Sequence, residues 1–534
     1  MNLRALCVLV CGAAAMGLAG FSTIAAAATF PGIGAGPIPD NNPAGLNITF
    51  NANGLTGPVG SVSVGITMTH TYLGDLRAEL ISPAGVAQMV VFGRTGMSRS
   101  STFGTSNDVN GTFAFSDDVS GDFWTASTTN PVPPGTYLPS ATGSTRSNAG
   151  GCATSLKGVF GDLTAAQGNG TWTLKISDNF NGDTGSVGAA TLTIGVDRIF
   201  RTGFDTPVAV STRCLNKVQA DFTGDGLTDY VLTRPVAGVV HWTVQENLGN
   251  GTGAPTTTEF DLGASATDFV DTIDIDGDRI ADAMVWTPAT GTFLIRRSSR
   301  PSAAPLAITF GQVDDDPINS GDYDGDMRDD LAVYRQPSIG QPAGPLQLVI
   351  RNTASATTRV VALGTGANFD EFVSAGFDYT GNAMADIAVQ RTDPMVTNGA
   401  LYTLLDGRSG SQISQFPFEK NSDFVMPGNY VGNGLYDITA SRTETIAAVP
   451  GRSYYTRDTA TGIAQPLVRF GVVNDVRVGG DYDGDGLSDY AIWRPSATVG
   501  MSQFQVRLST NTATVWTVAG GVQGDFPVAG SKVK

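Results

Sequence analysis

Histidine is scarce in this chain, and the shortage limits the chemistry that its side chains can perform. Only His70 and His241 occur among 534 residues. A Ser-His-Asp enzyme needs a histidine to take the proton of its serine, and both histidines lie in strand-like segments. The G-x-S-x-G motif that presents the serine of α/β-hydrolases is absent as well. We therefore expect no catalytic residue of this kind.

Basic residues are also few. Lysine and arginine total 32 against 49 aspartate and glutamate residues, which gives a formal net charge of -17. Nucleic-acid phosphates bind to basic surfaces, so we expect no nucleic-acid partner. Much of the acidic excess lies in short repeated loops, where bound cations would offset it.

Long apolar runs are missing after the N-terminus. Residues 1–28 are typical of a secretory signal peptide, because Arg4 precedes an apolar stretch and Ala26–Ala28 offers a cleavage site before Thr29. Retention of this segment as a membrane anchor is the alternative, which the small-residue end disfavours. No later stretch reaches the run of about 18 apolar residues that a spanning helix needs. We expect an exported protein (secreted and extracellular, at the cell surface or periplasmic) with no membrane span once the signal is removed.

Cysteine is rare too. Of four cysteines, Cys7 and Cys11 lie in the signal, which leaves Cys152 and Cys214. Export to an oxidising compartment would allow these two to pair, and closing the loop between them would contribute about 4 kcal/mol in the chain-entropy account. Two unpaired thiols are the alternative, because the sequence does not give the distance between them.

Helical periodicity is missing, whereas glycine and proline are abundant at 67 and 27 residues. This composition indicates many short strands joined by tight turns, hence an all-β protein. The chain after the signal is too long for one hydrophobic core. We divide it into a Pro/Gly-rich segment at 29–41, a β-sandwich at 42–198, a linker at 199–215 and a repeat domain at 216–534.

The predicted sandwich contains alternating apolar residues, as in Val62, Val64, Ile66 and Met68. Its more specific segments are, in order, HTYLGDL from His70, LISPAG from Leu80, GTWTLKISD from Gly170, GDTG from Gly182 and LTI from Leu192. These segments resemble the P domain (Homo B domain) that follows the catalytic domain of subtilisin-like proprotein convertases.

The resemblance to the P domain implies a jelly-roll β-sandwich that calcium often stabilises. On this basis Asp75, Asp178 and Asp183 are the residues expected to hold an ion. The alternative is that these aspartates cap turns, which needs no metal. The protease that precedes the P domain in that family has no counterpart in this sequence.

The repeat domain carries six short loops rich in glycine and acidic residues, about 50 residues apart, a period typical of propellers and solenoids. We number them loops one to six by their first residues, which are Asp221, Asp274, Asp322, Asp378, Asn429 and Asp481. Four strands per period would make one propeller blade, so six loops predict six blades. A ring of seven, with a degenerate first blade, is the alternative. Phe526 begins one further copy of the strand that precedes each loop, as expected if the last strand closes the ring.

The loops also predict metal sites. Acidic side chains recur at the first, third, fifth and ninth places, and calcium takes six to eight oxygen ligands. The expected ligands are Asp221, Asp225 and Asp229; Asp274, Asp276, Asp278 and Asp282; Asp322, Asp324, Asp326 and Asp330; Asp378, Asn382 and Asp386; and Asp481, Asp483, Asp485 and Asp489. Loop five keeps only Asp437 and is expected to be empty. The alternative is that the loops are Asp/Asn-Gly turns without metal.

With the Phe-Gly pairs at Phe310 and Phe470, the repeats resemble the FG-GAP/VCBS family. That resemblance implies a β-propeller with calcium-binding loops and does not imply a ligand. An EF-hand would need a glutamate at the twelfth place, where these loops hold apolar residues such as Val285 and Ile492.

Arginine recurs thirteen residues after most loop starts, at Arg234, Arg335, Arg391, Arg442 and Arg494. We expect these residues to tie neighbouring blades through carbonyls or carboxylates; a cationic ring that binds an anionic sugar or acidic peptide is the alternative.

The function expected from the sequence is calcium-dependent recognition or adhesion outside the cell, without a catalytic domain. The partner would be an extracellular protein or carbohydrate. Two alternatives stay open: a protease-associated accessory protein or serine-endopeptidase-related protein, through the P domain, and a propeller-type carbohydrate-active enzyme. Function in such folds lies in loops that fold analogy cannot interpret.

Overall fold

The computed structural model describes most of the chain. The described ranges are 27–96, 103–140, 154–161, 163–196, 218–249, 251, 255–264, 268–313, 315–317, 320–336, 344–365, 372–498, 500–511 and 513–528. The expected signal peptide (almost entirely), Cys152, Cys214 and the linker at 199–215 lie outside these ranges.

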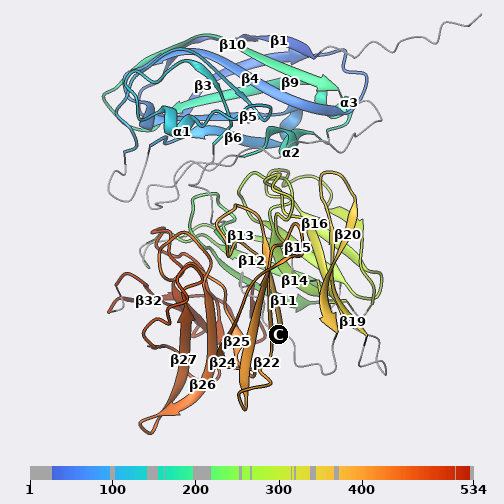
Figure 1. Cartoon of the computed structure of the whole chain (residues 1–534). Coiled ribbons are helices and arrows are strands. Elements are labelled where there is room, and N and C mark those ends of the chain that lie inside the picture. Colours follow the sequence, from blue (N-terminus) through green and yellow to red (C-terminus); the bar gives the residue numbers. More distant parts are fainter. Residues whose placement is uncertain are drawn as a thin grey trace, which may run out of the picture.

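The N-terminal domain is a β-sandwich (Figure 1). Its strands are β1 (Ala28–Ile33), β2 (Gly36–Ile38), β3 (Asn42–Ala52), β4 (Val59–His70), β5 (Leu76–Ile81), β6 (Gln88–Gly93), β7 (Val109–Ser116), β8 (Gly135–Tyr137), β9 (Gly170–Asp178) and β10 (Gly185–Val196). Its helical segments are short: η1 (Leu73–Asp75), η2 (Pro83–Gly85), α1 (Phe123–Ala126), α2 (Leu156–Phe160) and α3 (Ala165–Gly168).

Strand β1 joins the two layers of this sandwich. Its first half pairs with β10 and its last two residues pair with β3, which gives the order β6-β5-β9-β3-β1-β10-β4-β7-β8. Strands β1 and β2 lie in the segment 29–41, so the sheet extends N-terminally of residue 42, where the sequence placed its start. Alternation along β4 buries Val62, Val64, Ile66 and Met68 in the core, as the pattern predicted.

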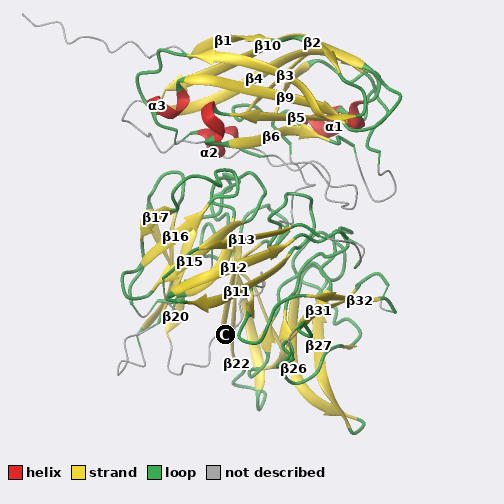
Figure 2. Ribbon diagram, turned by 180° about the vertical axis from the view of Figure 1, so that it is seen from behind, coloured by secondary structure: helices red, strands yellow, loops and turns green. Residues whose placement is uncertain are grey.

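The C-terminal domain is a β-propeller of six blades (Figure 2). Blade one contains β11 (Tyr230–Val236), β12 (Val239–Gln245), β13 (Thr257–Asp261) and β33 (Phe526–Pro527), and blade two contains β14 (Phe269–Ile273), β15 (Asp282–Thr287), β16 (Thr292–Arg296) and β17 (Leu306–Thr309). Blade three contains β18 (Leu331–Arg335), β19 (Pro345–Arg351) and β20 (Thr358–Thr365), and blade four contains β21 (Phe372–Phe377), β22 (Asp386–Thr392), β23 (Gly399–Leu405) and β24 (Gln412–Lys420). Blade five contains β25 (Phe424–Val425), β26 (Ile438–Ile446), β27 (Val449–Arg457) and β28 (Val468–Arg469), and blade six contains β29 (Val476–Arg477), β30 (Tyr490–Arg494), β31 (Gln503–Arg507) and β32 (Val515–Ala519). The predicted fold class and six-blade arrangement are therefore confirmed.

The last strand closes the ring, as the sequence predicted. In β33, Phe526 pairs with Thr233 and Pro527 with Leu232, so the C-terminal segment supplies the first strand of blade one. Blade three lacks a continuous first strand among the described residues; two isolated bridges, Asp316 to Tyr334 and Gly321 to Asp330, stand in its place. Pro317 follows the first bridge and has no N–H to donate to a ladder.

A ring of backbone hydrogen bonds links all six blades through their acidic loops. In each case the N–H of a loop's eighth residue donates to the carbonyl of the first residue of the preceding loop, at 2.6–3.0 Å. The pairs are Thr228 to Asp481, Ala281 to Asp221, Asp329 to Asp274, Ala385 to Asp322, Tyr436 to Asp378 and Ser488 to Asn429. The bond from Thr228 to Asp481 joins blade one to blade six, so the cycle is complete.

No helix in the described ranges is long and apolar enough to cross a membrane.

Candidate metal centres

Three acidic loops of the propeller bring carboxylates together closely enough for one cation. Each loop connects the first and second strands of its blade, and in each group the ligand oxygens lie within 4.8 Å of one another. The groups are Asp274, Asp276 and Asp282 in loop two; Asp322, Asp324 and Asp330 in loop three; and Asp481, Asp483 and Asp489 in loop six. The sequence predicted all nine of these residues as ligands.

The first-place residue organises the backbone of each loop. One side-chain oxygen accepts the N–H of the fourth residue at 2.6–2.9 Å in all six loops. In the five loops that begin with aspartate, the second oxygen accepts the N–H of the sixth residue at 2.8–3.0 Å. Glycine at the fourth place has a positive φ, such as 73° at Gly277, which a side chain would resist.

The fifth and ninth places are also held by backbone bonds. The fifth-place oxygen accepts the N–H of the seventh residue in every loop, at 2.9–3.0 Å. One oxygen of the ninth-place aspartate accepts the N–H of the second residue at 2.8–3.2 Å. Its other oxygen accepts an N–H that follows the third strand of the blade, at 2.7–3.4 Å. The ninth-place aspartate therefore stabilises the backbone of all six loops, independently of any metal.

The third place differs, because the loop does not need an acid there. Loops with Thr223, Thr380 or Val431 at this place keep the bond from the fourth-place N–H to the first-place side chain. In loop two, Oδ1 of Asp276 and Oδ2 of Asp278 are buried with no hydrogen-bond partner in the described structure. A buried carboxylate oxygen without a partner is costly, and a bound cation would satisfy an oxygen of this kind.

Burial and mutual repulsion raise the pKa of the ninth-place carboxyl in these three loops well above the ordinary value. Burial, followed by the charge of Asp324, raises the pKa of Asp330 to about 9. Burial, followed by Asp276 and Asp274, raises the pKa of Asp282, and burial with Asp481 and Asp483 does the same for Asp489. The raised pKa values reflect a concentration of negative charge that a cation would offset, and its binding would release the protons that these carboxyls hold.

The remaining loops have fewer acids. In loop one, burial and Asp225 raise the pKa of Asp221 to about 8, but Thr223 occupies the third place. Loop four has Thr380 and Asn382, and burial raises the pKa of Asp386 to about 7. In loop five, the amide of Asn429 donates to the carbonyl of Gly486 at 2.7 Å, a bond that an aspartate could not make. The difference in cation binding between the loops stays a prediction.

The acidic residues of the sandwich are arranged differently. Asp178 accepts from Nε2 of His70 at 3.1 Å and from the N–H of Phe180 at 3.1 Å, and Asp183 accepts from the hydroxyl of Thr71 at 2.8 Å. Burial, followed by Asp178 and Asp183, raises the pKa of Asp75 to about 6. The three carboxylates affect one another electrostatically, and two of them also stabilise turns.

Both histidines have structural partners. Nδ1 of His70 lies 2.9 Å from the carbonyl oxygen and 3.1 Å from the backbone nitrogen of Tyr72, and Nε2 lies 3.1 Å from Oδ2 of Asp178, so both ring nitrogens are engaged. Nδ1 of His241 lies 2.8 Å from Oδ1 of Asp261 on the neighbouring strand.

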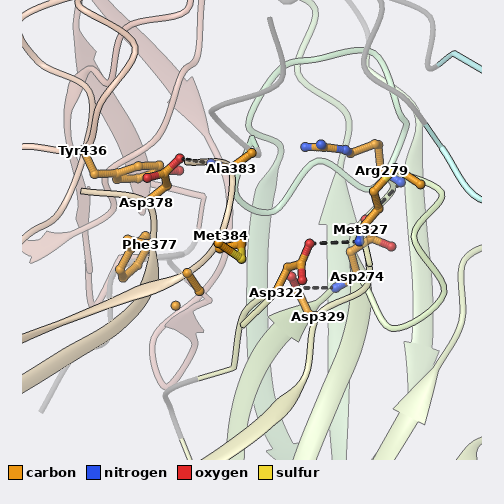
Figure 3. Close-up of a pocket in the computed structure, with 12 residues that line it drawn as sticks. Asp274, Arg279, Asp322, Met327, Asp329, Phe377, Asp378, Ala383, Met384 and Tyr436 are labelled. Atoms are coloured by element: carbon orange, nitrogen blue, oxygen red, sulfur yellow. Dashed lines mark hydrogen bonds between the residues drawn. The ribbon is translucent and has the colours of Figure 1, made fainter. Parts of the chain in front are cut away.

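A small pocket lies where loops two to five meet (Figure 3). Its volume is about 70 Å³, and its lining includes Asp274, Arg279, Asp322 and Tyr436. Asp274 donates its N–H to Oδ2 of Asp329 across the blade boundary at 2.8 Å.

The sandwich contacts the propeller at loop two and its surroundings. The N–H of Ser155 donates to the carbonyl of Gly277 at 3.0 Å, and that of Gln88 donates to the carbonyl of Ser299 at 3.1 Å. Ser299 in turn donates its hydroxyl to Asp276 at 2.5 Å. Backbone packing is close enough that a Cβ on Gly158 would lie 1.7 Å from the carbonyl oxygen of Asp276. Occupancy of loop two and docking of the sandwich therefore involve the same residues.

The repeated arginines bind carboxylates or a carbonyl at the boundaries between blades. Arg335 forms a bidentate pair with Asp315, and Arg494 with Asp475, each with two contacts of 2.8 Å. Arg234 and Arg442 likewise pair with Asp525 and Asp423, and Arg391 donates to the carbonyl of Leu363. The four aspartates lie in the connections from the preceding blades, which confirms the prediction that these arginines tie blades together.

One comparison with known proteins identifies part of the first domain. The proprotein convertase P-domain family matches residues 59–125, and no curated protein sequence is significantly similar to the chain. Among solved structures, an Agrocybe aegerita lectin that recognises non-reducing terminal N-acetylglucosamine is 14% identical, with a TM-score of 0.34 over 58% of this chain and 83% of its own. The NanB sialidase from Streptococcus pneumoniae is 10% identical, with a TM-score of 0.16 over 87% and 78%. These TM-scores are too low to support an argument about either function.

Proposed function

We propose that this chain is a secreted calcium-binding protein that recognises an extracellular protein or carbohydrate and has no catalytic domain of its own. The observation that carries the proposal is the set of buried carboxylates in loops two, three and six, including two oxygens of loop two that have no partner among the described residues. The ligand set contains only oxygen atoms, which is the chemistry that calcium prefers. Secretion rests on the signal-like sequence of residues 1–28.

In loop two, Asp274, Asp276, Asp278 and Asp282 would hold the ion, and loops three and six offer the equivalent residues. Loops one and four would bind more weakly, because threonine replaces the third-place acid. The ion would supply the positive charge that these buried carboxylates lack. Six blades linked through their loops would then present a rigid surface, the usual role of a propeller.

Thermal unfolding tests the calcium part of the proposal. Calcium at millimolar concentration should raise the melting temperature by several degrees relative to excess chelator, since a ligand that binds only the folded state stabilises it. Magnesium should have a smaller effect because it dehydrates reluctantly and prefers rigid octahedral sites. An identical melt in calcium and in chelator would refute calcium binding.

The recognition part needs a separate experiment. Immobilised glycan and protein arrays should be probed with the full chain, with and without calcium. Binding that depends on calcium supports recognition by the calcium-loaded fold. Absence of binding to every extracellular glycan and protein tested would contradict it.

A second candidate is an accessory role beside a protease, favoured by the P-domain match at residues 59–125. In that case the isolated protein would show no glycan binding but would alter the stability or activity of a subtilisin-like protease added in trans.

A further inference from the structure

Two buried arginines meet between blades five and six without a carboxylate partner. Arg452 on β27 is 5% exposed and Arg477 on β29 is 8% exposed. Arg452 donates from Nη2 to the backbone carbonyl of Asp475 at 2.8 Å, and its Nε is buried with no partner. Within the described ranges, Arg477 makes no hydrogen bond or ion pair; its guanidinium carbon lies 3.9 Å from the centroid of the Phe424 ring.

The carboxylates of the surrounding connections are already in use. Asp475, two residues before Arg477, accepts from two guanidinium nitrogens of Arg494 and from the N–H of Val472 at 2.7 Å. Asp423 and Glu419 are both bound to Arg442. The positive charge of Arg452 and Arg477 is therefore uncompensated by the described side chains.

The hydroxyl of Tyr454 is a third hydrogen-bond donor near Arg452 and Arg477. Tyr454 on β27 is fully buried, and its hydroxyl has no hydrogen-bond partner in the described part of the chain. Burial raises the pKa of this hydroxyl, whereas the nearby charges of Arg452 and Arg477 lower it. Burial, followed by the charge of Arg452, lowers the pKa of Arg477 to about 10. The three side chains thus lie close enough to influence one another.

Other blades do not place charge at these positions. The second residue of the first strand is Val270 in blade two, Val425 in blade five and Pro527 in blade one, where blade six has Arg477. Arg452 directly precedes Ser453, the residue that pairs with the repeated arginine Arg442. The equivalent residues of the other blades are Val240, Gly291, Leu346, Ala400 and Ser502. Apolar or small residues therefore satisfy the fold at both positions. Two independent departures from the repeat bring arginines to one boundary.

A buried charge without a partner is strongly unfavourable, and two like charges side by side increase the cost. Arginine is also the side chain best suited to bind a planar or tetrahedral oxyanion, because its N–H groups form a fork. The arrangement of two forks, one hydroxyl and an adjacent aromatic ring matches an anionic ligand better than a purely structural role.

We propose that Arg452, Arg477 and Tyr454 form a binding site for an oxyanion (a carboxylate, sulfate or phosphate group) between blades five and six. The site lies away from the acidic loops, because Arg477 ends β29 before the chain reaches Asp481, and Arg452 pairs with Thr443 in the interior of β26. The site does not depend on calcium. It would bind a small anion or the anionic group of a larger ligand.

The test measures the melting temperature of the full chain, in 1 mM calcium, against rising sodium sulfate, sodium acetate and sodium glucuronate, with sodium chloride at equal ionic strength as reference. The wild type should show a saturable rise of about 5 °C at a hundredfold excess over Kd for at least one oxyanion. A response to glucuronate or acetate alone identifies a carboxylate site, and a response to sulfate alone identifies a tetrahedral-anion site.

Two variants restore residue types found in other blades: Arg477→Val and Arg452→Val. Each should lose the saturable response while staying folded, since removal of an unpaired buried charge does not destabilise the metal-loaded protein. Arg477→Gln serves where a valine variant does not fold. Arg335→Gln is the matched control; it breaks a compensated pair in blade three, so it should lower stability and keep the anion response. Absence of a saturable effect in the wild type, or an unchanged response in the arginine variants, would overturn the proposal.

Discussion

At the scale of single residues, the acidic loops separate two roles that the sequence pattern combines. Ninth-place aspartates are fixed by backbone N–H groups in every loop, including loop five, where Asp437 is the only acid at the four expected places. Third-place aspartates occur only in loops two, three and six, and the loop conformation is kept without them. The third place is therefore the residue position that best distinguishes a metal loop from a simple turn.

This distinction predicts opposite effects of two substitutions in loop six. Asp483→Asn should remove one bound calcium and leave the calcium-free protein as stable as wild type, because repulsion with neighbouring carboxylates falls. Asp489→Asn should lower the free energy of unfolding by about 1–3 kcal/mol even without calcium, since the N–H of Tyr482 or Ser509 loses its acceptor. Urea unfolding in the presence of chelator measures the stability of both calcium-free variants.

Asp437→Asn in loop five is the matched control for the ninth place. It should destabilise the protein as Asp489→Asn does and leave the number of bound calcium ions unchanged. Equal destabilisation by Asp483→Asn and Asp489→Asn in chelator would contradict the assignment of separate roles.

The raised pKa values predict that the stability of the calcium-free protein falls as the pH rises. Unfolded aspartates titrate near 3.9, whereas burial and neighbouring charges raise the pKa of Asp330 to about 9 and that of Asp221 to about 8. The folded state therefore binds more protons between these values, and stability falls as the pH rises from about 4 to 9. Calcium replaces the protons, so the calcium-loaded protein should keep its stability over the same range.

Urea unfolding at pH 5 and pH 8, with and without chelator, measures this effect. A calcium-free protein that becomes more stable between pH 5 and pH 8 would show that the loop carboxylates are not held in a repulsive cluster.

At the scale of elements, the period of the loops was enough to predict the number of blades and the closing strand. Apolar alternation identified the sandwich strands in the same way. The ring of bonds between neighbouring loops could not be predicted, because it joins backbone atoms of residues as different as Thr228, Ala281 and Tyr436. Strand β1 was missed because Pro31, Gly32 and Gly34 suggested a turn-rich segment, although a strand that crosses between sheets tolerates them.

Closure of the ring by β33 predicts a large effect of a short deletion. Removal of residues 525–534 deletes the pairing of Phe526 and Pro527 with β11 and the carboxylate that binds Arg234. The melting temperature of the propeller should fall by several degrees, because blade one loses a strand and the toroid opens. Removal of residues 530–534 alone is the control and should change little. Equal melting temperatures for both truncations would mean that the closing strand contributes no stability.

At the scale of the whole molecule, the sandwich and the propeller share the surroundings of loop two. No local pattern in the sequence predicted this contact, since it pairs a backbone N–H near residue 155 with a carbonyl near residue 277. Arg300 adds a bond from Nε to the carbonyl of Val159 at 3.2 Å. Calcium in loop two would stabilise the surface on which the sandwich docks.

Hydrogen exchange can test this coupling, because the amides of Ser155 and Gln88 donate across the interface. Asp276→Asn should lose one calcium and reduce the protection of both amides. Arg300→Ala should reduce the same protection while every calcium stays bound. Wild-type protection at Ser155 and Gln88 in the Asp276→Asn protein would separate docking from the metal.

The most direct test of the central claim is a count of calcium ions bound to the purified full chain, by equilibrium dialysis at micromolar to millimolar calcium. We predict at least three ions, assigned to loops two, three and six by the loss of one ion in each of Asp276→Asn, Asp324→Asn and Asp483→Asn. Binding of no calcium at millimolar concentration, or a count that these three substitutions leave unchanged, would contradict the account.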